Sequence, residues 1–425
     1  MSETINVLIF PAGEVNSLEL HDALSGCVNV KVIGASSVDR HGPYVFDNYV
    51  SGLPNIFEAN FLEEFNKLLL EEKIDVVFPT HDSVALFFAE NKDKISCKVV
   101  GSDLETASIC RDKRKTYEVF KEEDFCPVVY ELPPDDKIFF IKPKDGQGSQ
   151  GARIVKNPKE ISTLDLNDFV MTEYLPGIEL TVDCLTDYDG KLIFISPRSR
   201  DRTMAGISVA AHLYPLTQEI SKIAQRINAK LFFRGLWWFQ IKLDSNNRWK
   251  LLEISVRCAG SMAVTRASGA NLPLATVYIL TGKKVSVCAQ NYSVSMDSSL
   301  IRRYKLGITF ENVYIDLDDT IIVGGKINLK AMWFLYQCIN ERKKIFLITR
   351  HEESVSDTLK KYSICPSIFA KIIHITNNQK KSQLISNSNS IFVDNSWHER
   401  EDVRKSLSIP VFDVEGIEFL MDWRS

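Results

Sequence analysis

The chain has 425 residues and a formal net charge of −4 at pH 7, so two or three domains are expected. Its near balance of basic and acidic residues gives no electrostatic reason to expect a nucleic acid or an anionic membrane as partner. No apolar run reaches the roughly 18 residues that a membrane span needs. The amino terminus lacks the features of a secretory signal. The 9 scattered cysteines contain no CxxC pair, so we expect reduced thiols in a cytoplasmic protein.

Residues 1–104 alternate short apolar runs with amphipathic stretches, which is typical of a doubly wound α/β sheet. The turn after the first run, PAGEVNSLE, lacks GxGxxG, so nucleotide binding by this region is not expected. The expected strands lie at 5–10, 28–34, 75–80 and 97–101, and the expected helices lie at 62–72 and 84–92.

The strongest local signal is FFIKPKDGQGSQGARIV, residues 139–155. An apolar strand ends at Lys142, a loop with three glycines follows, and a second strand comes after the loop. Glycines let backbone N–H groups approach phosphate oxygens closely, and the lysine supplies a fixed positive charge. A strand follows where a P-loop has a helix, so this is not a P-loop. Taken alone, the segment also fits a plain glycine-rich hairpin.

Two oxygen-bearing side chains follow on a predicted hairpin, residues 237–261. Gln240 and Glu253 lie on its two strands, so both can face one side. An oxygen pair of this kind suits Mg²⁺, which prefers hard ligands and keeps positions for phosphate oxygens. Arg257 comes four residues after Glu253 and is placed to neutralise charge on a transferring phosphoryl group.

In this order the motifs resemble the ATP-grasp superfamily, specifically the short relatives of the carbamoyl-phosphate synthase large chain. The resemblance covers about residues 5–290. It implies a Rossmann-like leading domain, residues 1–104, and an α+β ATP-grasp domain, residues 105–300, that closes on ATP. The motifs that carry it are DVVFPTHD, the DK of RDKRKTYEVF, IKPKDGQGSQG, TEYLPGIELTVD, SPRSR and FQIKLD…LLEISVRCAGS.

The resemblance implies that lysines and glycines bind the phosphates and that two glutamates flank the adenine and the ribose. It also implies that Gln240 and Glu253 ligate the metal, and that Arg257 is the arginine of the family's E-x-N-P-R motif. Ser255 replaces the asparagine of that motif, and Gln240 stands where many members have glutamate, so a second Mg²⁺ is expected to be loosely held or completed by water. The implied nucleotide-binding residues are Lys113, Lys142, Gly146, Gly148, Ser149, Gly151, Glu173 and Glu179.

For the substrates, the resemblance implies a ligase, in which ATP phosphorylates a carboxylate and an amine then displaces phosphate. Arg198 and Arg200 are expected to hold the substrate carboxylate or the acylphosphate, with a pair of surface arginines as the alternative. Asp82, with His81, is expected to touch the substrate, because ligands of doubly wound sheets bind beyond the carboxyl ends of strands. Residues 203–212 fit either a mobile flap or an ordinary loop and strand.

From residue 308 a second α/β series begins. Its first strand ends in VYIDLDDT, residues 313–320, where Asp316 and Asp318 lie two positions apart and therefore point to the same side. Two later apolar strands end in carboxylate or hydroxyl side chains, and a predicted helix starts with two lysines. These residues are Thr349, Asp394, Lys380 and Lys381, and helices are expected over 327–342, 352–361 and 380–386.

Carboxylates, a hydroxyl and a lysine in this order resemble the haloacid dehalogenase-like (HAD) phosphohydrolases, over residues 308–425. The resemblance implies a Rossmannoid domain in which Asp316 becomes an aspartyl-phosphate and Asp318 acts as acid and base. Asn395 departs from a second aspartate that is often found there. The implied phosphoryl contacts are Thr349 and Lys381, with Lys380 as the alternative, and the implied Mg²⁺ ligands are Asp316, Asp318 and Asp394.

The spacing of these motifs leaves little room for a cap domain. Only 28 residues separate Thr320 from Thr349, and 31 separate Thr349 from Lys381. After the helix and strand of each gap are counted, only a minimal cap fits. We therefore expect an open site, suited to a large phosphorylated substrate or covered by a neighbouring domain.

The sequence thus predicts a bifunctional enzyme, an ATP- and Mg²⁺-dependent carboxylate–amine ligase fused to a Mg²⁺-dependent HAD-type phosphatase. Its expected partners are small carboxylates and amines and a phosphorylated metabolite, and a homodimer is left open. One alternative is an ATP-grasp kinase for a small molecule. Another is a non-catalytic nucleotide-binding protein with an inert HAD module.

Overall fold

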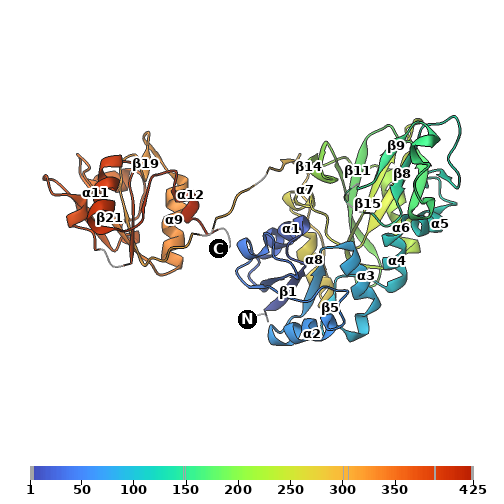
Figure 1. Ribbon diagram of the computed structural model, residues 1–425, viewed down its shortest axis with the longest axis horizontal. Coiled ribbons are helices and arrows are strands. Elements are labelled where there is room, and N and C mark those ends of the chain that lie inside the picture. Colours follow the sequence, from blue (N-terminus) through green and yellow to red (C-terminus); the bar gives the residue numbers. More distant parts are fainter. Residues whose placement is uncertain are drawn as a thin grey trace. The chain divides into compact units, whose positions relative to one another are not determined.

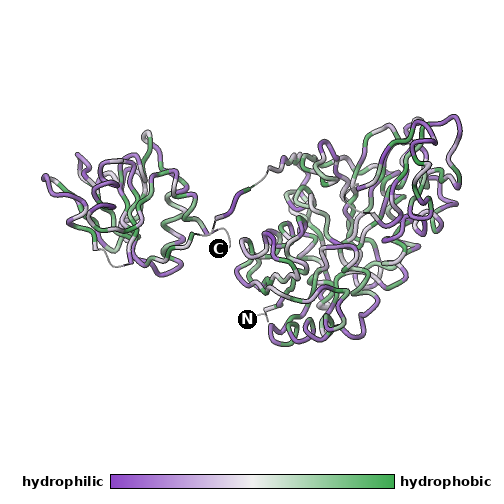
Figure 2. The backbone as a smooth tube through the Cα atoms, viewed as in Figure 1, coloured by the Kyte–Doolittle hydropathy of each residue, from purple (hydrophilic) through white to green (hydrophobic). Residues whose placement is uncertain are grey.

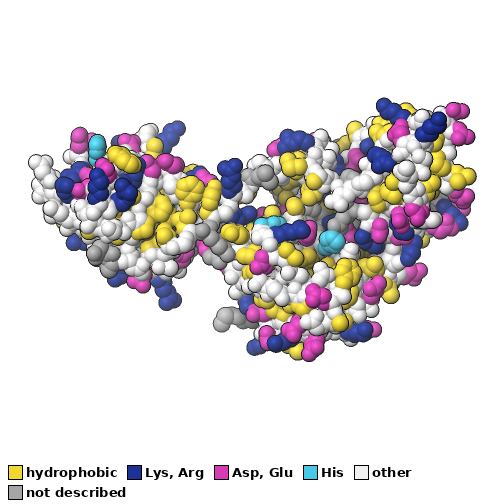
Figure 3. Space-filling model, in the orientation of Figure 1, with side chains coloured by type: hydrophobic (Ala, Val, Ile, Leu, Met, Phe, Trp, Pro, Cys, Tyr) yellow, Lys and Arg dark blue, Asp and Glu magenta, His cyan; other side chains and the backbone are white. Residues whose placement is uncertain are grey.

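The structure is a computed structural model that describes residues 4–146, 148, 150–299, 301–304, 306–386 and 389–422. The chain divides into two compact units, Met1–Leu300 and Ile301–Ser425 (Figure 1). Within the described part, no helix has the length and apolar character of a membrane span. In the view of Figure 3, basic and acidic side chains are interspersed over both units.

The first unit begins with the predicted parallel sheet, which has the strand order β3-β2-β1-β4-β5. Apolar clusters cover its two faces, and the hydrophobic tube segments of Figure 2 follow its strands. Its strands are β1 (Ile5–Phe10), β2 (Val30–Ala35), β3 (Tyr49–Val50), β4 (Val76–Pro79) and β5 (Lys98–Val99), and its helices are α1 (Val15–Leu24), α2 (Phe61–Glu71) and α3 (Asp82–Glu90).

Two antiparallel sheets follow in the same unit, with the strand orders β7-β10-β8-β9 and β12-β11-β15-β16. The strands are β6 (Gly101–Ser102), β7 (Val129–Tyr130), β8 (Phe139–Pro143), β9 (Arg153–Val155), β10 (Phe169–Glu173), β11 (Glu179–Thr186), β12 (Leu192–Ser199), β15 (Phe233–Leu243) and β16 (Trp249–Ser255). The helices are α4 (Leu104–Arg111), α5 (Lys113–Phe120), α6 (Gln218–Lys230), α7 (Ala263–Ala267) and α8 (Leu272–Leu280). A small sheet joins β13 (Arg202–Met204), β14 (Ile207–His212) and β17 (Ser295–Asp297).

The leading sheet and the second antiparallel sheet share a core. One apolar cluster contains Val7 of β1, Leu20 of α1, Leu236 of β15 and Leu272 of α8. A buried hydrogen bond adds to this packing, because the side-chain amide of Asn16 donates from Nδ2 to the carbonyl oxygen of Cys258 (3.0 Å). The two regions therefore form one compact unit, and their division at residue 104 stays a prediction.

The second unit is a parallel sheet of the order β22-β21-β18-β23-β24, with apolar clusters on its two faces. Its strands are β18 (Asn312–Ile315), β19 (Ile322–Val323), β20 (Lys326–Ile327), β21 (Lys344–Thr349), β22 (Lys371–His374), β23 (Ser390–Val393) and β24 (Val411–Phe412). Its helices are α9 (Leu329–Asn340), α10 (Val355–Lys361), α11 (Trp397–Leu407) and α12 (Ile417–Leu420).

The prediction of a helix over 380–386 is wrong. This segment contains only a short 3-10 turn, Lys381–Gln383. The backbone of Lys380 is extended, and the backbone N–H of Ser386 donates to the hydroxyl of Tyr314 instead of to a helical carbonyl. A contact with β18 thus takes the place of the next helical turn.

Candidate functional site

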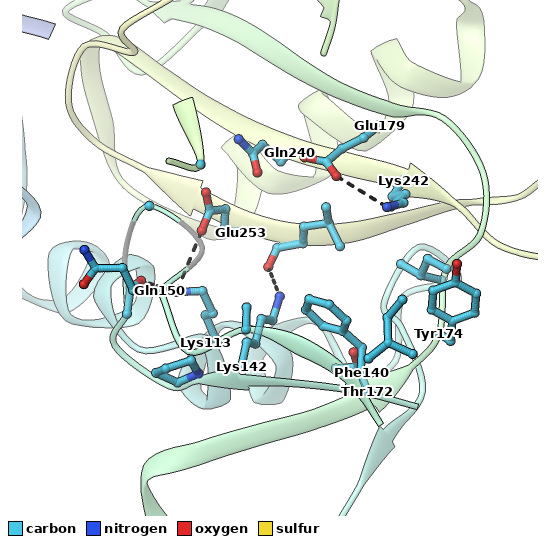
Figure 4. Close-up of a pocket in the computed structure, with 18 of the residues that line it drawn as sticks. Lys113, Phe140, Lys142, Gln150, Thr172, Tyr174, Glu179, Gln240, Lys242 and Glu253 are labelled. Carbon is cyan, nitrogen blue, oxygen red and sulfur yellow. Dashed lines mark hydrogen bonds and ion pairs between the residues drawn. The ribbon is translucent and has the colours of Figure 1, made fainter. Parts of the chain in front are cut away.

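A cavity of about 230 Å³ lies between the two antiparallel sheets of the first unit. Strands β8 and β10 form one wall, and β11, β15 and β16 form the other (Figure 4). The sheet register orders the second wall into rows, because residues i and i+2 of a strand share a face about 7 Å apart. The rows are Glu179 and Lys242, then Thr181, Gln240 and Glu253, then Asp183, Trp238 and Ser255.

Two lysines reach this cavity from α5 and β8. Lys142 Nζ is buried and donates to the hydroxyl of Tyr117 (2.7 Å) and the carbonyl of Leu252 (2.8 Å). Burial, and then the neighbouring charge of Lys113, lower the pKa of Lys142 to about 7. Lys113 Nζ donates to the carbonyl of Gly146 (2.8 Å) and lies 3.8 Å from Glu253 Oε2. Both lysines thus line one cavity, and Lys113 also contacts the glycine-rich loop. Their binding of phosphate stays a prediction.

The glycine-rich loop lies against the turn between β13 and β14. Gly146 and Gly148 line the cavity, and Gly148 and Gly151 have positive φ (61° and 72°), a conformation that glycine adopts without strain. A side chain at Gly206 would clash with the backbone of Gly148, so the two turns are in direct contact. The predicted Ser149 lies outside the described residues. Residues 203–212 form strands β13 and β14 with the turn between them, the loop-and-strand alternative of the sequence analysis.

The other end of the cavity has a mixed apolar and carboxylate lining. Phe140 and Leu175 offer apolar surface, with Glu173 beside them. Glu173 Oε1 accepts a hydrogen bond from the backbone of Val128 (2.9 Å). Glu179, predicted on the ribose side, lies 3.6 Å from Lys242 Nζ and 2.6 Å from Arg200 Nε. A flat apolar slot beside carboxylates suits a nucleoside.

The predicted metal pair is brought together. Gln240 and Glu253 are register partners on β15 and β16. In the amide orientation that satisfies both neighbours, Gln240 donates to Glu253 Oε1 (3.2 Å) and accepts from Arg200 Nη1 (3.1 Å). Within the described residues no group of three His, Cys, Asp or Glu side chains could hold a metal. In this orientation the amide oxygen faces Arg200. A Mg²⁺ held by both side chains would therefore need the amide to turn its oxygen towards Glu253, and would take its other ligands from phosphates. Ser255 does not complete the pair, because its hydroxyl donates to Asp82 (3.1 Å).

A second cavity of about 190 Å³ adjoins the first. Both are lined by Arg200, Gln240 and Glu253, so these side chains stand where the cavities meet. The second cavity extends to the turn after β1, the end of β4 and the loop after β16. Its residues there include Glu14, Thr80, His81, Trp238 and Arg257.

Each of the predicted substrate residues, Asp82, Arg198 and Arg200, has an ion-pair partner within the protein. Arg257 Nε and Nη2 donate to the carboxylate of Asp82 (2.8 and 3.0 Å). Burial opposes ionisation of Asp82, yet Arg257 holds its pKa below the ordinary value. Asp82 thus forms an ion pair with Arg257, and its contact with a substrate stays a prediction. The alternative of surface arginines is wrong for Arg198, which is fully buried against Asp183 (2.8 Å).

Sequence reasoning missed two residues that line the second cavity and one that supports a lysine of the first. Tyr117 holds the buried Lys142, Trp238 lines the second cavity, and Glu14 stands on the turn after β1. The period of two along β15 could have placed Trp238 beside Gln240. The position of Glu14 depends on packing between segments more than 200 residues apart, which no local pattern reveals.

In the second unit, the three central strands bring the predicted carboxylates together. Lys381 Nζ donates to Asp316 Oδ1 and Asp394 Oδ2, both at 2.7 Å. Burial, offset by Lys381 and reinforced by Asp394, raises the pKa of Asp316 to about 6. Lys380 instead donates to Asp402 on α11 (2.6 Å). The structure thus distinguishes the two candidate lysines in favour of Lys381.

Lys381, Asp316 and Asp394 form a trio. Asp318, the third predicted metal ligand, pairs with another residue instead. Its carboxylate is half exposed, and both oxygens lie 3.0 Å from Nδ1 of His351. His351 Nε2 lies 2.7 Å from the hydroxyl of Thr358. Thr349 is buried, and its hydroxyl accepts from the backbone of His351 (3.2 Å). His351 is therefore a further residue of this site that the sequence motifs did not single out.

Comparison with known proteins concerns mainly the first unit. Residues 165–299 match a family model described as "ATP-grasp in the biosynthetic pathway with Ter operon". The chain is 29% identical over 153 residues to the 3-methyl-D-ornithine--L-lysine ligase of Methanosarcina barkeri, which covers 35% of this chain and 40% of that protein. It is 23% identical over 307 residues to the carbamoyl phosphate synthase arginine-specific large chain of Bacillus subtilis, covering 64% of this chain and 29% of that protein. Each match thus spans less than half of the relative.

One similar solved structure is the biotin carboxylase domain of 2-oxoglutarate carboxylase from Hydrogenobacter thermophilus, in complex with MgADP, ADP and bicarbonate. It is 17% identical to this chain, with a TM-score of 0.54, and the match covers 68% of this chain and 72% of that one. At this identity the likeness is one of fold.

Proposed function

We propose, from the ATP-grasp fold of this chain, that its first unit is an ATP-dependent carboxylate–amine ligase. The observation that carries the proposal is the meeting of two cavities at Arg200, Gln240 and Glu253. One cavity has two lysines and a glycine-rich loop for phosphates, and the other has room for a small acid. The ligase of Methanosarcina barkeri supports the reaction class, because its name describes the joining of two amino acids.

Under this proposal each group has a task. Lys142, Lys113 and the backbone of the glycine-rich loop bind phosphate oxygens, and Gln240 and Glu253 hold Mg²⁺. Bound MgATP supplies the phosphoryl group that activates the carboxylate. Little covalent chemistry is required of the protein, so positioning and charge neutralisation carry the reaction.

Arg200 stands at the point of transfer. Its guanidinium bonds Glu179 and the carbonyl of Gly206 (3.0 Å), which fixes it between the two cavities. There it binds the incoming carboxylate beside the terminal phosphate. Arg257, held by Asp82, lines only the second of the two cavities and orients the rest of the acid.

A screen of ADP release tests the ligase. Pairs of amino acids are assayed with ATP and Mg²⁺, and products are identified by mass. We expect ADP release that requires both an acid and an amine, and its loss in Lys142→Met, with Lys137→Met on the exposed loop before β8 as the matched control. ADP release with an acid-derived phosphate product and no need of an amine indicates the kinase alternative. Nucleotide binding without ADP release across the panel indicates the non-catalytic one.

A specific observation favours a second function. Lys381 bridges Asp316 and Asp394 at the carboxyl ends of the central strands of the second unit, where ligands of parallel sheets bind. We infer a HAD-type phosphatase, in which Asp316 attacks the phosphorus of a phosphate ester and Lys381 neutralises charge. The ester P–O bond breaks, Asp318 protonates the leaving alcohol, and water then hydrolyses the aspartyl-phosphate to release phosphate and regenerate Asp316. Asp316 and Asp394 offer oxygen ligands to Mg²⁺, which stabilises the transferring group when it is bound.

Hydrolysis of phosphate esters by the full chain tests this second function. We expect Mg²⁺-dependent release of phosphate, lost in Asp316→Asn. Asp319→Asn is the matched control, because Asp319 is exposed and has φ of 51°, which asparagine tolerates. Equal rates in both variants would contradict the assignment of the nucleophile.

A further inference from the structure

The second cavity of the first unit looks basic, since three arginines line it, but each of them already has a carboxylate partner. Arg198 pairs with Asp183, where both side chains are buried. Arg200 pairs with Glu179, and Arg257 pairs with Asp82. Arg198 and Arg257 are therefore compensated within the protein. Glu179, in contrast, is shared between Arg200 and Lys242 (3.6 Å), so Arg200 keeps charge for one carboxylate of a ligand, and little attraction remains for a second.

His81 adds no positive charge at neutral pH. Burial lowers the pKa of His81 below its ordinary value, and its Nδ1 accepts a hydrogen bond from the backbone of Ser83 (3.2 Å). The ring is therefore a neutral wall of the cavity.

Glu14 is the carboxylate at the far end from the ATP-side cavity. It stands on the turn after β1 and lines the second cavity. Its ion-pair partner is Arg40, at 3.1 Å, whose side chain is 61% exposed. Solvent weakens such an exposed pair, so it compensates Glu14 far less than the buried pairs compensate the arginines. The far end of the cavity is thus acidic.

Trp238 lines the second cavity between Arg200 and Glu14 and indicates that a ligand binds there. It lies one row beyond Gln240 on the same face of β15, about 7 Å away. The side chain is 5% exposed, and no acceptor meets its indole N–H among the described residues. A buried donor without an acceptor is costly, so an oxygen of the bound acid is expected to accept from it.

We propose that the second cavity binds an acid that carries an ammonium group, an amino acid rather than a dicarboxylate, and that Glu14 binds this ammonium group. The carboxylate lies at Arg200, and the ammonium group lies at the far end. The cavity, about 190 Å³, corresponds to about six waters of liquid volume, which suits one small amino acid. The inference names the acid of the proposed ligase and rests on that function for its reaction.

Binding is tested separately from turnover. The full chain is loaded with Mg²⁺ and a non-hydrolysable ATP analogue, and calorimetry measures acids matched in length: 5-aminopentanoate, L-ornithine and L-lysine against pentanoate, glutarate and adipate. We expect at least one ammonium acid to bind tenfold or more tightly than its uncharged and dicarboxylate counterparts. Tighter binding of a dicarboxylate or an uncharged acid would overturn the proposal, and so would no binding of any ammonium acid.

Two variants test whether the Glu14 carboxylate is the group that binds the ammonium. Glu14→Gln is expected to weaken binding of the preferred ammonium acid tenfold or more and to leave the affinity of the ATP analogue unchanged. Glu63→Gln, the same change at an exposed position of α2, is expected to change neither. An unchanged affinity for the acid in Glu14→Gln overturns the role of Glu14.

An assay of turnover distinguishes a failure of this inference from a failure of the proposed ligase function. Hydroxylamine replaces the amine and traps an activated carboxylate as a hydroxamate, with release of phosphate. Binding of ammonium acids through Glu14 without ADP formation would support the inference and contradict the ligase. ADP formation with dicarboxylates and not with ammonium acids would do the reverse.

Discussion

At the scale of single residues, the two sites keep buried charge in different ways. In the first unit, Lys142 is buried and forms no ion pair with a carboxylate among the described residues. Burial lowers its pKa to about 7. The second unit places a lysine between two carboxylates, so burial is offset by direct ion pairs. The charge of Lys142 is therefore available to an anionic ligand, whereas the charge of Lys381 is already neutralised by Asp316 and Asp394.

The low pKa of Lys142 predicts that nucleotide binding depends on pH. Below pH 7 the free protein carries the charged amine, and above pH 7 it is increasingly neutral. A bound triphosphate favours the charged form, so binding above pH 7 must take up a proton. We expect the affinity for ATP to fall by up to tenfold per pH unit above 7, and calorimetry in buffers of different ionisation enthalpy to detect proton uptake at pH 8. In Lys142→Met both effects should vanish.

The trio of the second unit predicts a strong effect of Lys381. In Lys381→Met, Asp316 and Asp394 lose their counter-charge while they remain buried, which costs about 3–5 kcal/mol of the unfolding free energy at pH 7.5. The loss should shrink as the pH falls through about 6, where Asp316 takes up a proton, and the raised pKa of Asp394 acts in the same direction. Chemical denaturation measures it. Lys380→Met, whose exposed pair with Asp402 is weak, should change stability by less than about 1 kcal/mol, and an equal loss in both variants would contradict the account.

At the scale of elements, the two turns that close over the ATP-side cavity depend on glycine. The turn between β13 and β14 has φ of 77° at Gly206, directly against the backbone of Gly148. The glycine-rich loop between β8 and β9 therefore keeps its position only while residue 206 has no side chain. Arg200 adds to this contact through the carbonyl of Gly206.

Gly206→Ala should therefore weaken nucleotide binding without unfolding the unit. The strained backbone costs about 1–2 kcal/mol, and the methyl group displaces the glycine-rich loop. We expect the KM for ATP to rise about tenfold in a steady-state assay of ADP release. Gly282→Ala has a similar φ (83°) but open space around it, so it controls for strain alone and should leave this KM unchanged.

The elements show why some of this was predictable and some was not. The period of two placed Gln240 beside Glu253, because strand geometry fixes which side chains share a face. The same period was expected to hold Asp316 and Asp318 together, but β18 ends at Ile315, and the two carboxylates have different partners, Lys381 and His351. The partners of the arginines were not predictable, since Asp82 and Arg257 are 175 residues apart in the chain. The same holds for Lys381, which a helix was expected to position and an irregular turn positions instead.

At the scale of the whole molecule, the chain consists of two compact units with separate cores. Each proposed site is built from the residues of one unit. The two activities should therefore respond to different substitutions and different ligands.

Thermal unfolding should show this division as two transitions, since separate cores need not unfold together. A non-hydrolysable ATP analogue with Mg²⁺, at 100 times its Kd, should stabilise the first unit by about 2.7 kcal/mol and leave the transition of the second unchanged. Calorimetric scans with and without the analogue measure this. A single transition that shifts as a whole would contradict independent units.

The central claim is that a nucleotide binds between the two antiparallel sheets of the first unit, and a crystal structure with Mg²⁺ and a non-hydrolysable ATP analogue tests it most directly. The account predicts that the phosphates lie within hydrogen-bond distance of Lys142 and the glycine-rich loop, with the cation on Gln240 and Glu253. An analogue bound elsewhere, with these four groups left without a ligand, would contradict it.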